Sequence, residues 1–222
     1  MNKYKLSGEN VTKAFGRRLI FSNVNFSYGS SGIYGIAGFN GSGKSTLVKV
    51  ILGLLSASSG KIKHLLDDKE IPSENLHDFV GFAAPYLILY DEFTASENLQ
   101  HFAKIRGTEL NREKTDYFLN EFLLYDRRND YVKGYSSGMK QRLKYVFALM
   151  HSPKLVILDE PTSNLDNPGK EIAYKIIESE SVTSTVILAS NEENDLALCK
   201  SVIQIENFKT ANQRVNTQKT GF

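Results

Sequence analysis

One stretch of the sequence decides the fold, and it reads Gly38-Phe39-Asn40-Gly41-Ser42-Gly43-Lys44-Ser45-Thr46. It matches the pattern G-x-x-x-x-G-K-[ST] and lies between an apolar run at 33–37 and a second apolar segment at 47–52. Glycines let the chain wrap closely around a phosphate with its N–H groups pointing inward, a conformation that a Cβ would obstruct. We expect Lys44 to place its charge on the β- and γ-phosphates and Ser45 to offer its hydroxyl to Mg²⁺. This stretch, called the phosphate loop below, predicts a nucleotide site between a buried strand and the positively polarised start of a helix.

An acidic pair ends a second buried run, in Leu155-Val156-Ile157-Leu158-Asp159-Glu160. Such a strand would deliver Asp159 to the magnesium shell and Glu160 to the place where an attacking water would lie. Buried carboxylates in a row are costly unless a metal ion or hydrogen bonds compensate them, so a purely structural role is disfavoured. The phosphate loop and the acidic pair form the two halves of one predicted site.

Composition sets outer limits on what the chain can be. Its 222 residues, 41% hydrophobic and 23% charged, provide apolar material for one sizeable core or two small lobes and exclude a disordered chain. The formal net charge of +2 gives no electrostatic reason to expect nucleic acid as a partner. Residues 1–7 lack the apolar core of a secretory signal, and no apolar run approaches the roughly 20 residues of a membrane-spanning helix. We expect a cytosolic chain whose one cysteine, Cys199, is a small buried hydrophobe.

The hydrophobic pattern predicts a mostly parallel α/β sheet. Separated by helical stretches, apolar runs typical of strands buried on both faces recur at 33–37, 79–83, 155–158, 185–189 and 202–205. Shorter alternating segments between residues 3 and 28 favour antiparallel strands. From Asn207 onward the chain is polar and without periodicity, so we expect a frayed tail.

Helical periodicity dominates between about residues 85 and 150. One helical stripe there consists of Met139, Leu143, Val146, Phe147 and Met150. Ser136 or Ser137 can cap the start of this helix, and Pro153 stops it.

Two further motifs flank the acidic pair. Ahead of it stands Tyr135-Ser136-Ser137-Gly138-Met139-Lys140-Gln141-Arg142, and behind it stands Pro161-Thr162-Ser163-Asn164-Leu165-Asp166. In this order, with the phosphate loop, they resemble the signature sequence and the D-loop of the ATP-binding cassette (ABC) ATPases. The resemblance extends over residues 4–209 and implies an α/β P-loop NTPase core with an N-terminal antiparallel β-subdomain and an inserted α-helical subdomain. We accordingly expect a single ABC ATPase domain over 1–222, with the catalytic core and β-subdomain in 1–84 and 151–222 and the helical signature subdomain in 85–150.

The signature gives a second anion cradle to a chain that already has one. A Ser-Ser-Gly turn at a helix start offers N–H and hydroxyl donors, which here belong to Ser136, Ser137 and Gly138. The resemblance implies that the signature of one subunit closes on the γ-phosphate held by another, in a head-to-tail dimer that encloses two ATP molecules with Mg²⁺. Asp166 is the last residue of the D-loop motif. Alternatively, the Ser-Ser-Gly turn only caps its helix.

Three positions bear on nucleotide binding and turnover. Phe15 stands where the family usually has an aromatic residue that stacks on adenine, and packing in the core is its alternative role. Pro85 aligns with the glutamine of the family's Q-loop, but proline cannot coordinate Mg²⁺ through its side chain and stiffens the hinge. Asn191 replaces the family's switch histidine; it can donate a hydrogen bond but cannot carry a proton. With Glu160 and Asn191 in the catalytic roles, we predict slow hydrolysis.

The resemblance implies a cytoplasmic ATP-binding and ATP-hydrolysing subunit of an ABC transporter, peripheral to the inner face of the cell membrane. ATP would close a homodimer or a heterodimer, and the movement would drive an integral membrane transporter subunit. The compact chain is similar to the ATPases of exporters. That partner is expected to dock near Tyr86, Leu87, Tyr90 and Phe93, which could instead form subdomain core. The alternatives are a soluble ABC ATPase outside transport and a nucleotide-binding regulator with weak hydrolysis.

Overall fold

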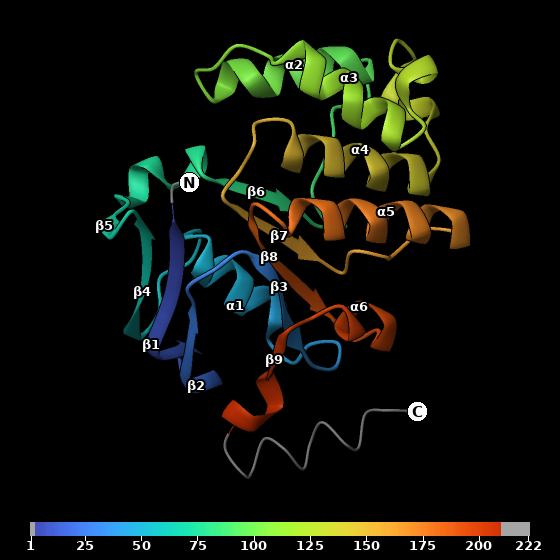
Figure 1. Ribbon diagram of the computed structural model, residues 1–222. Helices are drawn as coiled ribbons and strands as arrows, with labels where there is room; N and C mark the ends of the chain where they lie inside the picture. Colours follow the sequence, from blue (N-terminus) through green and yellow to red (C-terminus); the bar gives the residue numbers. More distant parts are fainter. Residues whose placement is uncertain (1–2, 210–222) are drawn as a thin grey trace.

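A five-stranded parallel sheet forms the centre of the computed structural model, which describes residues 3–209 (Figure 1). Its strand order is β6-β7-β8-β3-β9, and all neighbouring strands are parallel. The strands are β3 Gly32–Ala37, β6 Val80–Ala83, β7 Leu155–Asp159, β8 Thr185–Ser190 and β9 Ser201–Gln204. The five predicted apolar runs are thus confirmed to within one residue at each end. β3, β7 and β8 are buried along their whole length, whereas the edge strand β9 is partly exposed.

A four-stranded antiparallel sheet accompanies the central one, in the order β2-β1-β4-β5. Its strands are β1 Tyr4–Phe15, β2 Arg18–Tyr28, β4 Ser59–Leu66 and β5 Lys69–Glu70. β1 and β2 confirm the antiparallel strands predicted between residues 3 and 28. The sequence pattern does not predict β4 and β5, because β4 is half-exposed and its partner β1 lies far away along the chain, with Tyr4 opposite Leu66.

Helices cover both faces of the central sheet. They are α1 Lys44–Ile51, α2 Ala95–Ile105, α3 Arg112–Glu121, α4 Ser137–Leu149, α5 Asn167–Glu180 and α6 Glu193–Ala197. α1 packs on β7 and β8 from one side, and α4 and α5 lie side by side on the other (Figure 1). α2 and α3 form an outer layer on α4. The fold is therefore the predicted α/β P-loop architecture, with an antiparallel sheet and an added helical layer.

Short 3₁₀-helices connect these elements. They are Ser73–Asp78, Tyr125–Arg127, Val132–Gly134 and Ile205–Phe208. The last of them contradicts the predicted tail at its start, because Asn207 still lies in ordered helix packed on β2. The rest of the predicted tail, 210–222, lies outside the described residues.

Alternate residues of the central strands face two separate apolar clusters. In β8, Val186 and Leu188 belong to the cluster under α4 and α5, whereas Ile187 and Ala189 belong to the cluster around α1. This is the period-two alternation of a strand, and full burial of an aliphatic side chain of this size contributes about 1.5–3 kcal/mol. Burial on both faces fixes the register of these strands, and the register determines which residues follow their C-terminal ends.

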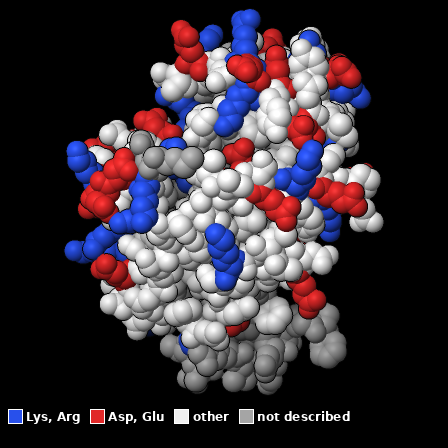
Figure 2. Space-filling model, in the orientation of Figure 1, with Lys and Arg blue, Asp and Glu red and all other residues white. Residues whose placement is uncertain are grey.

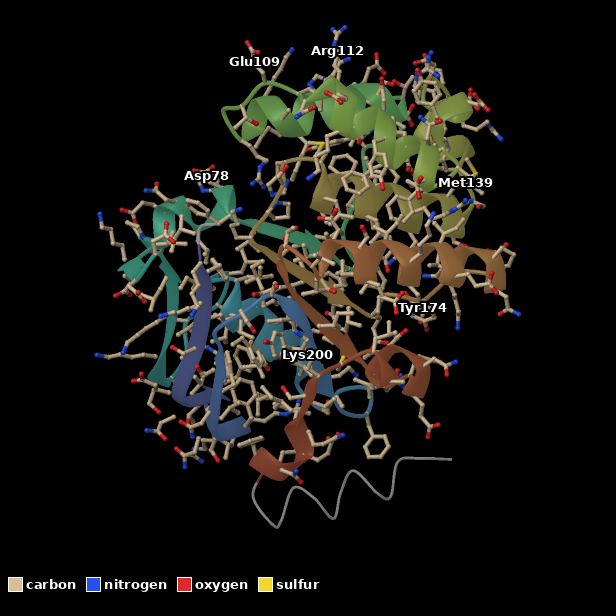
Figure 3. All side chains as sticks on the ribbon, viewed as in Figure 1. Asp78, Glu109, Arg112, Met139, Tyr174 and Lys200 are labelled. Atoms are coloured by element: carbon tan, nitrogen blue, oxygen red, sulfur yellow. The ribbon has the colours of Figure 1, made fainter. Side chains whose placement is uncertain are left out.

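Residues of the predicted helical stripe line the first cluster. Leu143 and Val146 are fully buried, and Met139, labelled on α4 in Figure 3, is partly buried against the same cluster. Cys199 also packs against it but is only half-buried, because its segment lies at the edge of the cluster. Burial raises the pKa of the Cys199 thiol to about 12, so the thiol stays protonated near neutral pH.

Charged side chains of both signs are interspersed on the surface. Figure 2 shows Lys and Arg beside Asp and Glu over the helical layer and the antiparallel sheet. Among the described residues on this face, no large area carries a single sign.

Candidate functional site

The phosphate loop connects β3 to α1, at the edge of the sheet where the parallel strands end. Gly43 directly precedes α1 with φ at 114°, and a Cβ there would lie 2.7 Å from Ile20 Cγ2. Gly41 also has a positive φ, at 75°. Residues with a Cβ are strained in such conformations, so the glycines permit the compact turn that the motif predicts.

A cavity of about 650 Å³ opens at the phosphate loop. Besides loop residues from Phe39 to Thr46, it is lined by Phe15, Arg18, Ile20 and Glu160. Phe15 is 50% exposed, so it does not pack in the core. The Lys13 ammonium lies 4.7 Å from its ring centroid, so a base would have to stack on the exposed part of the ring. The motif does not reveal Arg18 and Ile20; their signal is the hairpin at Gly16, which brings the start of β2 back over the loop.

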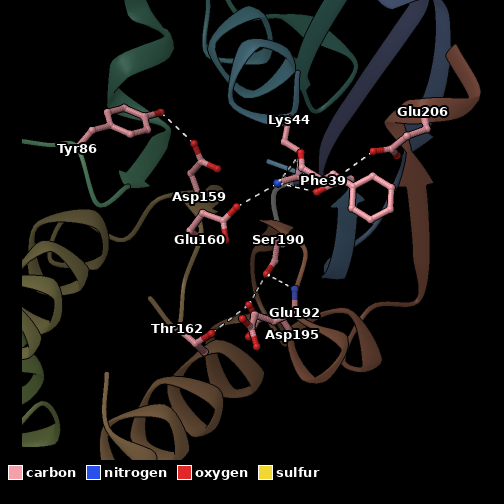
Figure 4. A network of polar contacts seen from close by, with 11 residues as sticks. Phe39, Lys44, Tyr86, Asp159, Glu160, Thr162, Ser190, Glu192, Asp195 and Glu206 are labelled. Carbon is pink, nitrogen blue, oxygen red and sulfur yellow. Dashed lines mark hydrogen bonds and ion pairs between the residues drawn. The ribbon is translucent and has the colours of Figure 1, made fainter. Parts of the chain in front are cut away.

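Lys44 is buried and bound from two sides (Figure 4). Its Nζ donates to the Gly38 carbonyl at 2.7 Å and lies 3.1 Å from Glu160 Oε1. Glu160 follows β7 with φ at 49°, and its N–H donates to the Ala189 carbonyl at 2.8 Å. The ion pair thus joins the two predicted halves of the site. The Phe39 carbonyl is a third, more distant acceptor at 3.5 Å. Phosphate oxygens would have to replace these three oxygen partners of the ammonium.

Asp159 has one free buried oxygen. It is 1% exposed; its Oδ2 accepts a hydrogen bond from the Tyr86 hydroxyl at 3.1 Å, whereas Oδ1 has no partner among the described residues. An unpartnered buried carboxylate oxygen fits a ligand of Mg²⁺, a cation that often takes one or two carboxylates and completes its shell with phosphate and water oxygens. Ser45 stands at the start of α1, where its hydroxyl could be a second ligand. Within residues 3–209, no group of three His, Cys, Asp or Glu side chains could hold a metal ion by itself.

Tyr86, not Pro85, is the residue of its segment that reaches Asp159. The carbonyl of Pro85 accepts a hydrogen bond from Lys144 Nζ, which ties the segment to α4. Burial and the nearby Asp159 carboxylate raise the pKa of Tyr86 above its ordinary value, so the hydroxyl keeps its proton and donates. Sequence reasoning missed this contact; its only signal is a polar side chain directly after a proline at the Q-loop position.

A second buried carboxylate, Asp195 in α6, ties together the surroundings of the site (Figure 4). Its Oδ2 accepts hydrogen bonds from Ser190 at 2.6 Å and Thr162 at 3.2 Å, and its Oδ1 accepts one from Tyr174 at 2.7 Å. Tyr174 extends from α5 toward α6 (Figure 3). These contacts join the end of β8, the D-loop motif and α5. Sequence reasoning missed Asp195, because a charged residue in a short helix usually indicates a solvated face.

Asn191 follows β8 and is exposed. β8 pairs with β7 so that Asp159 lies opposite Ala189, which places Asn191 and Glu160 at the same edge of the sheet. Asn191 is not among the residues that line the cavity.

The signature motif lies outside the cavity. Ser136 is the N-cap of α4 and its Oγ accepts from the Met139 N–H at 3.2 Å, so the turn does cap its helix. Ser136 and Ser137 are exposed, and a Cβ on Gly138 would meet the Asn164 carbonyl of the D-loop motif at 3.1 Å. Asp166 caps α5 by accepting from the Gly169 N–H at 3.0 Å. The structure therefore brings the phosphate loop, Phe15 and Glu160 together, but not the signature.

Comparisons with known proteins agree with this arrangement. The sequence model of the family described as ABC transporter matches residues 21–163. The uncharacterized ABC transporter ATP-binding protein YdbJ of Bacillus subtilis (strain 168) is 34% identical over 203 residues, which are 89% of this chain and 65% of the relative. The lantibiotic transport ATP-binding protein SrtF of Streptococcus pyogenes is 36% identical over 185 residues, 82% of this chain and 78% of the relative. The chain thus spans less than two thirds of YdbJ and somewhat more of SrtF.

Solved structures show the same fold. A bacterial Atm1-family ABC exporter with ATP bound superposes with a TM-score of 0.80 at 19% identity, over 91% of this chain and 38% of the exporter chain. A nucleotide-free ATP-binding cassette from an ABC transporter gives a TM-score of 0.75 at 23% identity, over 92% of this chain and 88% of the cassette. By its motifs, its fold and its relatives, the chain belongs to the ABC transporter family and has the fold of that family's ATP-binding domains.

Proposed function

We propose that the chain is the ATP-binding and ATP-hydrolysing subunit of an ABC transporter, and that ATP-dependent dimerisation drives a membrane partner. The observation that carries the proposal is the cavity in which Lys44, Glu160 and Phe15 meet. The printed names of SrtF and of the bacitracin transport protein BcrA of Enterococcus faecalis describe transport ATP-binding proteins. The names of these relatives give no support to a soluble ATPase outside transport or to a regulator.

Each residue of the cavity then has a task. Phe15 stacks on the base, the N–H groups of the phosphate loop hold the phosphates, and Lys44 exchanges its contact with Glu160 for phosphate oxygens. Ser45 and Asp159 would hold Mg²⁺, which would supply positive charge beside the phosphates. Glu160, once released by Lys44, orients and polarises the attacking water.

The exposed signature supports a head-to-tail dimer. Ser136, Ser137 and Gly138 form a helix start outside their own chain's cavity, so a second subunit is needed to bring them to a γ-phosphate. A homodimer and a heterodimer both satisfy this geometry. Asp166, at the start of α5, would lie with the D-loop at the same interface.

The segment 86–93 is the proposed contact for the membrane partner. Its aromatic side chains are exposed: Tyr86 by 46%, Tyr90 by 59% and Phe93 by 37%, while Leu87 is half-buried. This exposure argues against the alternative that they form subdomain core, and exposed apolar clusters often mark interaction sites. No helix among the described residues is long and apolar enough to cross a membrane. A place at the inner face of the cell membrane would therefore depend on such a partner.

We expect turnover to be slow. Asn191 cannot carry a proton, and losing a charge-assisted contact to the γ-phosphate costs roughly 2–4 kcal/mol in the transition state. Pro85 offers no side-chain ligand to the metal and stiffens the segment that leads to the helical layer.

The test of the proposal is MgATP hydrolysis across protein concentration, with Glu160→Gln as the control. Activity that rises faster than first order in protein, and that is lost in Glu160→Gln, supports a dimeric ATPase. Capture of the intact chain by detergent-solubilised membrane protein, lost when segment 86–93 is made polar, supports the transport role. Tight ATP binding without hydrolysis at any concentration would sink the proposal of an autonomous ATPase.

A further inference from the structure

We propose that Tyr86 is a positioning residue for the magnesium site: its hydroxyl holds one oxygen of Asp159 and leaves the other free for the metal. The inference rests on the proposed function and adds a residue to it. Tyr86 Oη lies 3.1 Å from Asp159 Oδ2, and Oδ1 of the same buried carboxylate has no partner among the described residues (Figure 4). A hydrogen bond to one oxygen restricts rotation of the carboxylate, so the free oxygen keeps a defined direction.

The ring of Tyr86 is itself held in place by the elements that build the site. The ammonium of Lys49, on α1, lies 4.8 Å from the ring centroid, and the ring of Phe82, on β6, lies 6.3 Å from it. α1 begins at the phosphate loop, so the same helix carries Lys44 and the cation above Tyr86. The Tyr86 ring thus has a neighbour on α1 and another on β6, and both restrict the position from which its hydroxyl donates to Asp159.

Pro85 explains why Tyr86, and not the residue at the Q-loop position, contacts Asp159. The proline side chain has no polar atom, and its carbonyl is already bound by Lys144. The next residue turns its side chain toward the sheet edge, helped by a turn in which the Leu87 N–H donates to the Ala84 carbonyl at 3.1 Å. A side chain one position later in the sequence thus contacts the acidic strand.

The position of Tyr86 also gives it two neighbours of different kinds. Its hydroxyl touches the metal ligand Asp159, while about half of the residue is exposed on the proposed contact segment 86–93.

The test compares Tyr86→Phe with Tyr117→Phe in the full chain. Both remove one hydroxyl and keep the ring, and Tyr117, on α3, is 50% exposed, close to the 46% of Tyr86. Mn²⁺ serves as the metal probe and is titrated by electron paramagnetic resonance in the presence of a non-hydrolysable ATP analogue. We expect Tyr86→Phe to weaken Mn²⁺ binding about 10-fold and Tyr117→Phe to stay within about 2-fold of the unchanged chain.

A second measurement separates positioning from damage. Binding of the analogue in EDTA depends on the phosphate loop and Phe15 but not on the metal, so it should be the same in all three proteins. Equal Mn²⁺ affinity in Tyr86→Phe and the unchanged chain overturns the inference, and so does an equal loss of analogue binding in EDTA. The experiment uses no membrane protein, so a failure of the transport proposal would leave this result standing.

Discussion

Two polar clusters lie at the ends of neighbouring parallel strands, and they differ in how completely their buried atoms are hydrogen-bonded. Both carboxylate oxygens of Asp195 accept hydroxyl hydrogen bonds. Asp159 is just as deeply buried, yet its Oδ1 has no partner among the described residues, and neither has the Oγ of Ser42 in the phosphate loop. Most buried polar atoms are hydrogen-bonded in folded proteins, so an unpartnered oxygen at the end of the acidic strand and another in the phosphate loop fit a ligand that binds there. The comparison separates a structural cluster from a ligand site.

The largest expected effect tests the structural cluster. Asp195→Ala leaves the buried hydroxyls of Ser190 and Thr162, and the partly buried hydroxyl of Tyr174, without their acceptor. We expect the free energy of unfolding in urea to fall by about 3–5 kcal/mol, because each orphaned buried group costs about 1–3 kcal/mol and part of the strain relaxes.

Tyr174→Phe is the matched control for this cluster. It removes one donor and leaves two, so the loss should be only about 1 kcal/mol. A loss under about 1 kcal/mol in Asp195→Ala itself would show that water satisfies the three hydroxyls.

The second prediction tests the ligand site. Lys44→Ala removes the cation that phosphate oxygens would bind, and we expect MgATP affinity, measured by calorimetry, to fall at least about 100-fold. The free energy of unfolding should change little, because the side chain of Glu160 remains 27% exposed and can be hydrated.

Lys63 offers a matched ion pair for this variant. Its Nζ lies 3.1 Å from Glu9 Oε1, the same distance as in the Lys44–Glu160 pair, but both side chains are exposed. Lys63→Ala should leave MgATP affinity unchanged and stability within about 1 kcal/mol. Retention of MgATP affinity within a few-fold in Lys44→Ala would assign the cavity to another ligand.

The third prediction concerns the residue that departs from the family at the same sheet edge. Asn191→His restores a side chain that can carry a proton, and we expect turnover of MgATP to rise at least about 10-fold. Asn191→Ala should not raise turnover. Equal rates in the unchanged chain and the histidine variant would show that Asn191 has no switch role.

How much of the fold and of the site could be predicted from sequence depends on how far apart in the sequence the contacting residues lie. The central strands follow from local apolar runs, and the phosphate loop and the acidic pair follow from motifs whose residues are neighbours in sequence. Ser136 as the cap of α4 is equally local. These features are fixed by backbone conformations and burial patterns that a short window already contains.

Most of the missed features depend on contacts between residues that are far apart in the sequence. Tyr86 reaches Asp159 across 73 positions, and Thr162 reaches Asp195 across 33. β4 is recognised as a strand only once β1 lies beside it. No sequence periodicity predicts such contacts, because they follow from the strand order of the sheet and not from the neighbouring residues in the sequence.

The smallest expected effect concerns a third buried polar group, His64 in β4. Its Nδ1 lies 2.6 Å from the Tyr4 hydroxyl and its Nε2 lies 2.9 Å from the Ile51 carbonyl, so the ring is hydrogen-bonded on both sides when Nε2 carries the proton. Burial lowers the pKa of His64 to about 4, whereas the ordinary value is 6.5. Like Asp195, this group is satisfied within the chain.

The sign of the resulting pH dependence follows from that lowered pKa. Between about pH 6.5 and pH 4 the unfolded chain binds a proton on His64 that the folded protein does not, so stability falls as the pH falls through this window. We expect His64 to account for about 1 kcal/mol of the stability lost between pH 7 and pH 5.5, measured by urea unfolding at both values. His64→Gln should reduce the loss by that amount and leave the contribution of His151, whose pKa burial also lowers to about 4. If His64→Gln loses as much stability between pH 7 and pH 5.5 as the unchanged chain, His64 takes up a proton in the folded protein. Full hydrogen bonding of a buried group would then not prevent it from binding a proton.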